Sequence, residues 1–243
     1  MFTLFKKEIR SFLSSLIGYI AICVFLLLVG LFLWILPTDS NILNNGYAGL
    51  DALFSLAPWV FLFLIPAITM RSFADERKAG TIEFLLTKPL TDLQIILAKY
   101  FASVTLVLFS LLPTIIYYFS IYKLGNPVGN IDSGGTWGSY IGLFFLASAF
   151  TAIGIFASSL SDNQIVAFIL AVFLCFFLYI GFEYISMLDL FGKMGALILA
   201  LGINDHYTSM SRGVIDTRDV IYYLSIIGIF ILMTKTKLES RKW

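Results

Sequence analysis

The 243-residue sequence is poor in charge, since only 13% of its residues are Asp, Glu, Lys or Arg, whereas 59% are hydrophobic. Soluble proteins typically contain about 25% charged and roughly 45–50% apolar residues. A water-soluble core of this length could not bury so much apolar surface, so the composition excludes an ordinary soluble domain. The 16 Lys and Arg nearly balance the 15 Asp and Glu, which gives no electrostatic reason to expect a nucleic-acid partner.

Residues that form disulfides or bind metals are also scarce. Cys23 and Cys175 lie in apolar runs without a C-x-x-C motif, so they predict buried thiols and no disulfide framework. His206 is the only histidine, and a single histidine beside Asp205 offers too few ligands for a metal site. We therefore expect no metal site in this chain.

Long apolar stretches are what the sequence has in quantity. A helix needs about 20 residues to cross the roughly 30 Å hydrocarbon core of a bilayer. The sequence therefore predicts an all-α integral membrane protein with six transmembrane helices in a single membrane domain, residues 1–243. The expected spans are residues 16–36, 52–70, 102–122, 137–158, 165–182 and 220–234.

The basic residues predict the orientation of these spans, because Lys and Arg are retained in the cytoplasm. With both termini inside, 12 of the 16 Lys and Arg lie in inner segments. Trp34, Trp59 and Trp137 then lie at the outer ends of their spans, where interfacial aromatic rings are common. The sequence thus predicts a multi-pass protein with cytoplasmic N- and C-termini.

Residues 1–14 are predicted to form an amphipathic helix. One face carries apolar residues at spacings of three and four: Phe2, Phe5, Ile9, Phe12 and Leu16. Another face carries Lys6, Lys7 and Arg10. Such a helix should lie flat against membrane lipids in the cytoplasmic interface. The alternative is that residues 1–14 are only a charged flank of the first span.

The inner loop, residues 71–99, combines charged and apolar residues. After Gly80, the residues Ile82, Leu85 and Leu86 share one side of a short predicted helix that ends at Pro89. The sequence TDLQ at 91–94 then predicts a capping box that starts the next helix. Exposed apolar residues here favour docking of a soluble partner. The alternative is an interfacial loop helix with its leucines in lipid.

Residues 76–89, ERKAGTIEFLLTKP, closely resemble the E-x-x-x-G-T-x-E-x-L-L-x-x-P segment that follows the second span in type 2 ABC-exporter (ABC-2) permeases. Residues 154–165 look like the same family's turn between spans four and five. The overall layout agrees with the family along the whole chain. Residues 212–216, RGVID, are more specifically similar to permease subunits associated with bacterial gliding motility (GldF-like).

This resemblance implies a permease subunit of an ATP-driven exporter in the bacterial inner membrane. A short coupling helix in the inner loop would rest in a groove of a separate cytosolic ABC ATPase subunit. The residues that would carry this coupling are Glu76, Gly80, Thr81, Glu83, Phe84, Leu85, Leu86 and Pro89. A second permease, either another copy or a paralogous subunit, would complete the pathway.

The chain itself is not expected to be an enzyme. Its only Gly-Lys pair, Gly192-Lys193, lacks the upstream glycine and the following Ser or Thr of a Walker A loop. We therefore expect this chain to bind no cofactor, while ATP and Mg are used by the partner ATPase.

The outer loop, residues 186–219, contains the apolar but interrupted stretch 187–203, which predicts a pair of re-entrant helices. Glu183 borders the apolar interior and is a candidate pathway residue, although a hydrated end residue is the alternative. Small residues in the fourth span predict close helix packing, either within the subunit or between subunits. They are Gly138, Gly142, Gly154 and Ser158.

A different functional class is a self-contained ion-coupled secondary transporter or an intramembrane enzyme. A carrier would be expected to place ionisable groups at mid-bilayer and often to contain inverted repeats. An intramembrane enzyme would need paired acids, histidine clusters or an activated nucleophile in the spans. The sequence displays none of these features, which favours the exporter hypothesis.

Overall fold

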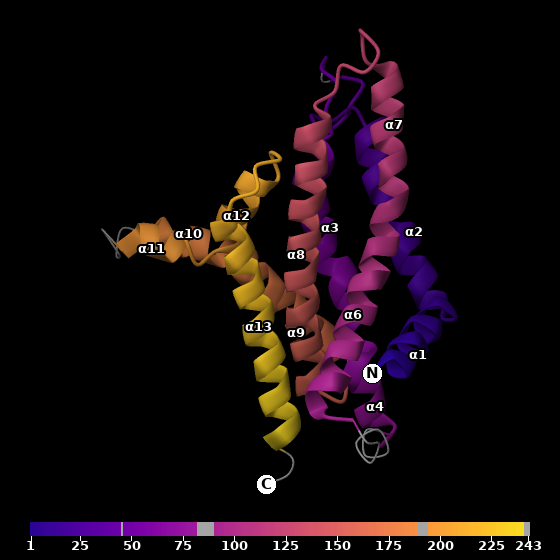
Figure 1. Ribbon diagram of the computed structural model, residues 1–243, viewed down its shortest axis with the longest axis vertical. Helices are drawn as coiled ribbons and strands as arrows, with labels where there is room; N and C mark the ends of the chain where they lie inside the picture. Colours follow the sequence, from indigo (N-terminus) through magenta and orange to yellow (C-terminus); the bar gives the residue numbers. More distant parts are fainter. Residues whose placement is uncertain (45, 82–89, 189–193, 241–243) are drawn as a thin grey trace.

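The computed structural model describes residues 1–44, 46–81, 90–188 and 194–240. Its regular elements within these ranges are all helices, and six of them are long and apolar enough to cross a membrane (Figure 1). The six are Gly18–Ile35, Asp51–Lys78, Asp92–Leu124, Ser133–Leu160, Gln164–Ser186 and Thr217–Glu239. The predicted all-helical fold with six candidate spans is therefore confirmed.

Most of these helices extend beyond the apolar stretches that predict them. The second comprises α3 (Asp51–Thr69) and α4 (Arg71–Lys78), and the third begins with α6 (Asp92–Leu111) and continues through a 3-10 turn (Leu112–Thr114) into α7 (Ile115–Leu124). Hydropathy alone misses these added turns because they carry charged residues. Ion pairs and hydrogen bonds of those residues compensate for that polarity, as described below.

Polar caps start several of the long helices. The Gln94 N–H donates to the Thr91 hydroxyl at 3.3 Å, and the Thr91 N–H donates to the Gln94 side-chain oxygen at 3.2 Å, so the predicted capping box of α6 is confirmed. Asp216 caps α13 (Thr217–Glu239) by accepting the Arg218 N–H at 2.9 Å, and this hydrogen bond lowers the pKa of its carboxyl.

The central helix of the bundle is α8 (Ser133–Leu160), which packs against α3, α6, α9 (Gln164–Phe176) and α13. Within the most apolar 18 residues of α8, 78% of the residues are buried. The corresponding share is only 22% in the first span, which consists of α2 (Leu16–Gly30) and a π-helical turn (Leu31–Ile35). The fifth and sixth spans are 28% buried. These three peripheral spans leave apolar faces for lipid or for a second subunit.

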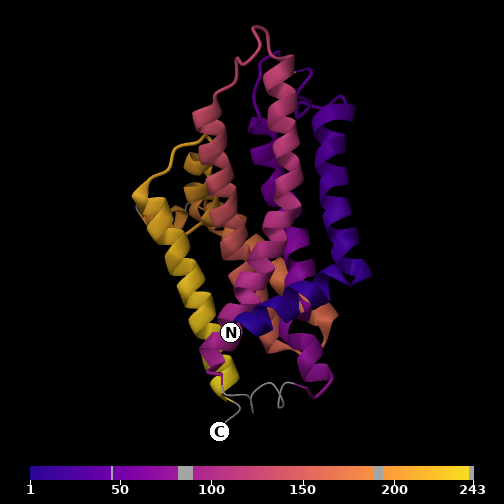
Figure 2. The ribbon, with the colours of Figure 1, turned by 45° about the vertical axis from the view of Figure 1, so that its right-hand side comes forward.

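Both termini lie at the lower end of the bundle in Figure 1, here called the terminal end, and the opposite end is the distal end. Helix α1 (Phe2–Leu13) crosses the terminal end at a steep angle to the spans (Figure 2) and packs against α6 and α2. Its location relative to lipid headgroups stays a prediction.

The apolar face of α1 differs from the predicted stripe. Leu4 is buried, whereas Phe2 and Leu16 are exposed. The reason is a break at Ser15, whose hydroxyl accepts the Gly18 N–H and caps α2, so Leu16 belongs to the next helix. The apolar side of α1 is therefore covered in part by protein, because it packs on α6.

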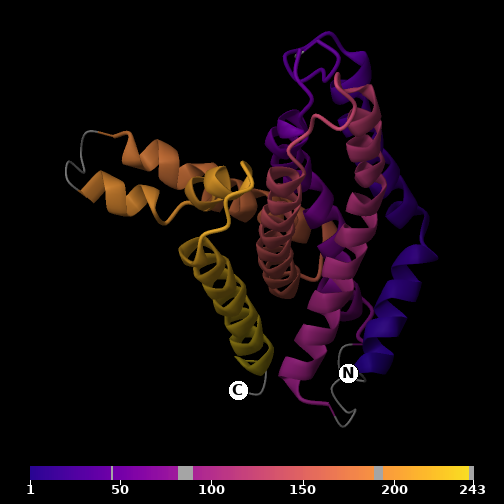
Figure 3. The ribbon, with the colours of Figure 1, turned by 45° about the horizontal axis from the view of Figure 1, so that its top comes forward.

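Short helices between spans five and six lie at about half the height of the bundle (Figure 1). A π-helical turn (Phe177–Gly181) joins α9 to α10 (Phe182–Ser186), which is followed by α11 (Gly195–Leu199) and α12 (Ile203–Met210). Helices α10 and α11 lie side by side and project away from the bundle (Figure 3). Their re-entry into a membrane stays a prediction.

His206 connects α12 to the start of α13. Its Nδ1 atom lies 2.7 Å from the Asp219 carboxylate, and its Nε2 atom lies 3.0 Å from the Ala200 carbonyl oxygen. The imidazole ring stacks on Tyr222 with the centroids 3.8 Å apart. Both ring nitrogens are thus used within the chain, in an arrangement that fixes the position of α12.

The small residues of α8 lie at contacts within the chain. A Cβ atom at Gly138 would collide with the Gly213 carbonyl, one at Gly142 with Met210, and one at Gly154 with the Thr69 hydroxyl. These glycines therefore let the loop before α13, helix α12 and helix α3 approach the backbone of α8 closely.

Substituting Gly138 by alanine should therefore destabilise the protein. The neighbouring atoms are backbone atoms of Gly213, which cannot move aside as a flexible side chain would, so we expect a loss of about 1–3 kcal/mol. Gly228 in α13 is the matched control, because a Cβ atom there has no neighbour within 4 Å. Gly228→Ala should be neutral or stabilise the helix by up to about 1 kcal/mol. Thermal unfolding in detergent measures both, and equal melting temperatures for the two variants would refute this packing argument.

Candidate functional site

The site is built around α4, the helix that leads into the inner-loop segment. Helix α3 ends at Thr69, and a hydroxyl from α8 bridges the junction with α4. Ser158 Oγ accepts the N–H groups of Phe73 and Ala74 at 3.0 and 3.2 Å and donates to the Met70 carbonyl at 2.9 Å. These hydrogen bonds fix the start of α4 on the central helix of the bundle.

Four charged side chains meet at the terminal end, and we call Lys7, Glu8, Glu76 and Lys99 the ionic cluster. Lys99 Nζ lies 3.0 Å from a carboxylate oxygen of Glu8 and 3.0 Å from one of Glu76. Lys7 Nζ lies 3.2 Å from Glu76 and 3.5 Å from Glu8. The ionic cluster therefore joins α1, α4 and α6, three segments that are far apart in the sequence.

The ionic cluster is unevenly buried. The side chain of Lys99 is 1% exposed and that of Glu76 is 13% exposed, whereas that of Lys7 is 59% exposed. The ammonium group of Lys99 also lies 5.2 Å from the centroid of the Phe73 ring, at cation–π distance. A buried ammonium group is tolerated only when it is paired, so Lys99 depends on both carboxylates.

The electrostatic environment raises the pKa of Lys7. Partial burial lowers the pKa, but the carboxylates of Glu8 and Glu76 raise it by a larger amount. Because the pKa in the folded protein lies above that in the unfolded chain, the ion pairs of Lys7 contribute fully to stability below the unfolded-state pKa of about 10.5, as long as both carboxylates are ionised. This contribution is lost as the pH rises through the folded-state pKa, and it is small because solvent screens the exposed side chain.

The end of α4 leads directly into the predicted coupling segment. Gly80 ends the helix with a left-handed conformation at φ +66°, and its N–H donates to the Arg77 carbonyl at 3.0 Å. Thr81 is exposed, and its hydroxyl lies 3.4 Å from the Glu76 carbonyl oxygen. The predicted coupling residues Glu83, Phe84, Leu85, Leu86 and Pro89 lie outside the described residues.

A further contact fixes α4 on span five, because the Gln164 side-chain amide donates to the Asp75 carboxylate. Three neighbouring helices therefore hold α4: α8 through Ser158, α6 through Lys99 and α9 through Gln164. The coupling segment thus follows a rigid helix and precedes the capped start of α6. Because these contacts hold α4 in place, we expect a displacement of the predicted coupling segment to move α4 as a unit.

The structure separates the other predicted site residues from the ionic cluster. Arg10 is exposed, and the Lys6 ammonium group lies over the ring of Phe2, 4.7 Å from its centroid. Glu183 lies in α10, which projects from the side of the bundle at about half its height (Figure 1). The sequence does not distinguish Glu8 from other surface carboxylates, and it marks Lys99 only as one of the basic residues that predict the orientation of the spans. A signal was present, because Lys99 interrupts an apolar helix and such a lysine needs a buried partner.

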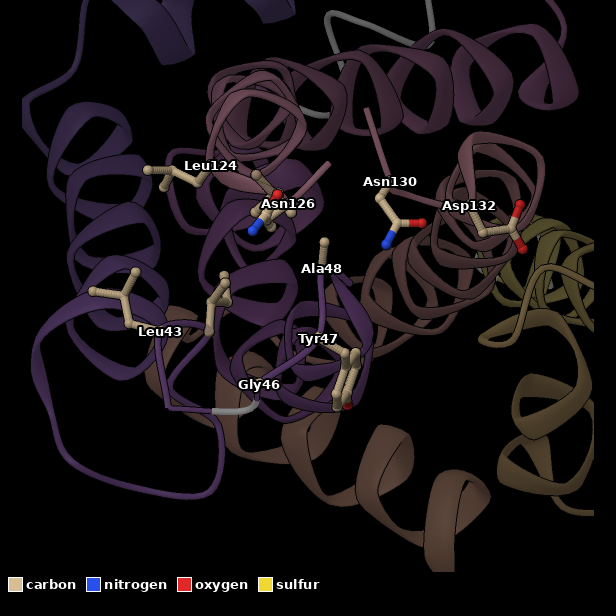
Figure 4. A pocket seen from close by; sticks show the side chains of 11 residues that line it. Leu43, Gly46, Tyr47, Ala48, Leu124, Asn126, Asn130 and Asp132 are labelled. Atoms are coloured by element: carbon tan, nitrogen blue, oxygen red, sulfur yellow. The ribbon is translucent and has the colours of Figure 1, made fainter. Parts of the chain in front are cut away.

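The distal end also has a cavity of about 590 Å3 between the loop before α3 and the loop after α7 (Figure 4). Tyr47, Asn126, Asn130 and Asp132 line it. The Asp132 carboxylate accepts the Gly135 N–H at 2.9 Å and so caps α8. This carboxylate therefore has a structural role already.

The sequence pattern of the ABC-2 family transporter proteins matches residues 2–207, which include α1, the ionic cluster and the first five candidate spans. The chain belongs to this family. A comparison with curated proteins finds no match. The permease is thus a multi-pass membrane component of an ABC transporter and, as its family implies, carries no ATPase domain. Permeases of this kind pair with ATPase subunits, which favours the exporter hypothesis over a self-contained carrier or an intramembrane enzyme.

Proposed function

We propose that this permease subunit is moved by a separate cytosolic ATPase through residues 76–89, and that it exports its substrate together with a second permease. The observation that carries the proposal is the ionic cluster. It joins the helix before the coupling segment to α1 and α6, with Lys99 at 3.0 Å from both Glu8 and Glu76. A movement imposed on the segment would therefore displace three helices together.

The proposed orientation places the terminal end in the cytoplasm of a bacterial cell, with the permease in the inner membrane. Twelve of the 16 Lys and Arg lie in segments that the sequence predicts to be cytoplasmic, and those that the structure describes belong to α1, α4, α6 and the end of α13, as the retention of basic residues in the cytoplasm requires. The ionic cluster and the coupling segment then lie on the side where ATP is available to the partner.

The second permease would be another copy of this chain or a paralogous subunit. The peripheral spans support this, because exposed apolar side chains such as Leu27, Phe173 and Ile229 lie on spans one, five and six. In a complex with the second permease, these side chains would pack against protein in place of lipid, where they would line or flank the transport pathway. A role in gliding motility is part of the proposal, supported by the resemblance of residues 212–216 to the permeases of that system.

Docking is tested by replacing Glu83, Leu85 and Leu86 together by alanine. Because a few apolar residues carry most of the energy of an interface, co-purification with the ATPase should fall by about tenfold or more. Leu197→Ala is the control, since Leu197 is an exposed leucine of α11, outside the coupling segment, and is 68% accessible. Unchanged co-purification and transport in the triple variant would disprove docking at this segment.

A further inference from the structure

A second cavity, of about 400 Å3, opens between α3, α10 and α12. Its volume lies within the range of small-molecule sites, roughly 300–1,000 Å3. Helix α3 contributes Ser55 and Trp59 to the wall, and α12 contributes Asn204 and Tyr207. The cavity is distinct from the ionic cluster, which lies at the terminal end.

Among the residues that the structure describes, Glu183 is the only one with a charged side chain that lines this cavity. One of its carboxylate oxygens accepts a hydrogen bond from the Asn204 side-chain amide at 2.9 Å. Among the residues for which the structure gives a position, no Lys, Arg or His forms an ion pair with Glu183. A partly buried carboxylate that lacks a cationic partner favours a positively charged ligand beside it.

Three aromatic rings form a continuous wall next to this carboxylate. The rings of Trp59 and Tyr179 lie edge to face, 6.1 Å apart at 88°, and those of Tyr179 and Tyr207 lie 6.5 Å apart at 61°. The Tyr207 hydroxyl donates to the Phe54 carbonyl at 2.7 Å, which fixes the orientation of its ring. Aromatic faces attract ammonium groups, and quaternary ammonium ligands are commonly bound in this way.

We propose that this cavity binds an organic ammonium cation. The ammonium group lies between the Glu183 carboxylate and the rings of Trp59 and Tyr179, and its apolar substituents contact Ile180 and Met187, which also line the cavity. The site does not depend on ATPase docking. A purely structural role of Glu183, in which it only ties α10 to α12 through Asn204, predicts no preference for a positive charge.

The test compares two ligands of the same shape on the full-length permease, purified in a maltoside detergent. Choline is the probe and 3,3-dimethylbutan-1-ol is its neutral isostere, and binding is measured by calorimetry and tryptophan fluorescence. We expect choline to bind about tenfold or more tightly than the isostere. Equal affinities, or no binding of choline, would overturn the proposal without any variant.

Two carboxylate variants locate the site. Glu183→Gln removes the charge and keeps a side chain that can accept from Asn204, so choline binding should weaken by about tenfold or more. Asp132→Asn removes the carboxylate of the cavity at the distal end while keeping an N-cap for α8, and choline binding should not change. Unchanged binding in Glu183→Gln, or an equal loss in Asp132→Asn, would show that the cation does not bind at Glu183.

Discussion

Replacing Lys99 by methionine should lower the free energy of unfolding by about 3–5 kcal/mol, the largest stability effect that we expect from a single substitution in this permease. Lys99 is 1% exposed and lies 3.0 Å from the carboxylates of both Glu8 and Glu76. Without its ammonium group, the two neighbouring carboxylates keep only the exposed Lys7 as a cationic partner and repel each other in a poorly solvated position. Thermal or denaturant unfolding in detergent measures the loss.

Two further variants separate this mechanism from a simple packing defect. Lys7→Met should change the free energy of unfolding by about 1 kcal/mol or less. The Lys7 side chain pairs with the same carboxylates but is 59% exposed, so solvent screens its charge. Adding Glu8→Gln and Glu76→Gln to Lys99→Met should restore much of the stability, because no unpaired buried charge is left. A triple variant as unstable as Lys99→Met would contradict the electrostatic explanation.

The same triple variant should uncouple ATP hydrolysis from transport. It leaves residues 80–89 of the coupling segment unchanged, so the ATPase should still bind, but α1, α4 and α6 are no longer joined by ion pairs. We expect transport to fall by about tenfold or more and ATP hydrolysis to stop responding to the permease, which corresponds to a coupling free energy above about 1.4 kcal/mol.

A matched control is the ion pair between Lys235 and Glu239, 3.6 Å apart, which lies at the same end but connects α13 only to itself. Lys235→Met with Glu239→Gln should leave transport and the response of the ATPase intact. If this variant loses coupling as completely as the triple variant, surface charge at the terminal end would be responsible, and the ionic cluster would have no special role.

The six candidate spans could be predicted because length and hydropathy are local properties of the chain. The capping box at Thr91 and Gln94 was predictable for the same reason. The ionic cluster was not, because it depends on the tertiary proximity of residues 8, 76 and 99, which no periodicity relates. Lys99 gave a partial signal, as a lysine within an apolar helix, but the sequence does not specify its partners.

The small residues of α8 illustrate the same limit of sequence patterns. Their spacing predicts close packing, yet the structure was needed to show that Gly154 faces Thr69 of α3 and that Gly138 faces the loop at Gly213. The apolar stripe of α1 was predicted with Leu16 in it, and the break at Ser15 places Leu16 in the next helix. Glu183 was recognised as a border residue, whereas its position beside Trp59 and Tyr179 follows only from the fold.

The central claim is that this permease is moved by an ATPase that it does not contain, and the movement of α4 relative to α13 tests it most directly. Nitroxide labels at Lys78→Cys in α4 and Thr236→Cys in α13, both exposed positions, would report the distance by pulsed electron resonance in nanodiscs, with Cys23 replaced by serine because it is also exposed. We predict that ATP changes this distance when the ATPase subunit is bound and has no effect on the permease alone. A change driven by ATP in the isolated permease, or an unchanged distance in the full complex, would contradict the account.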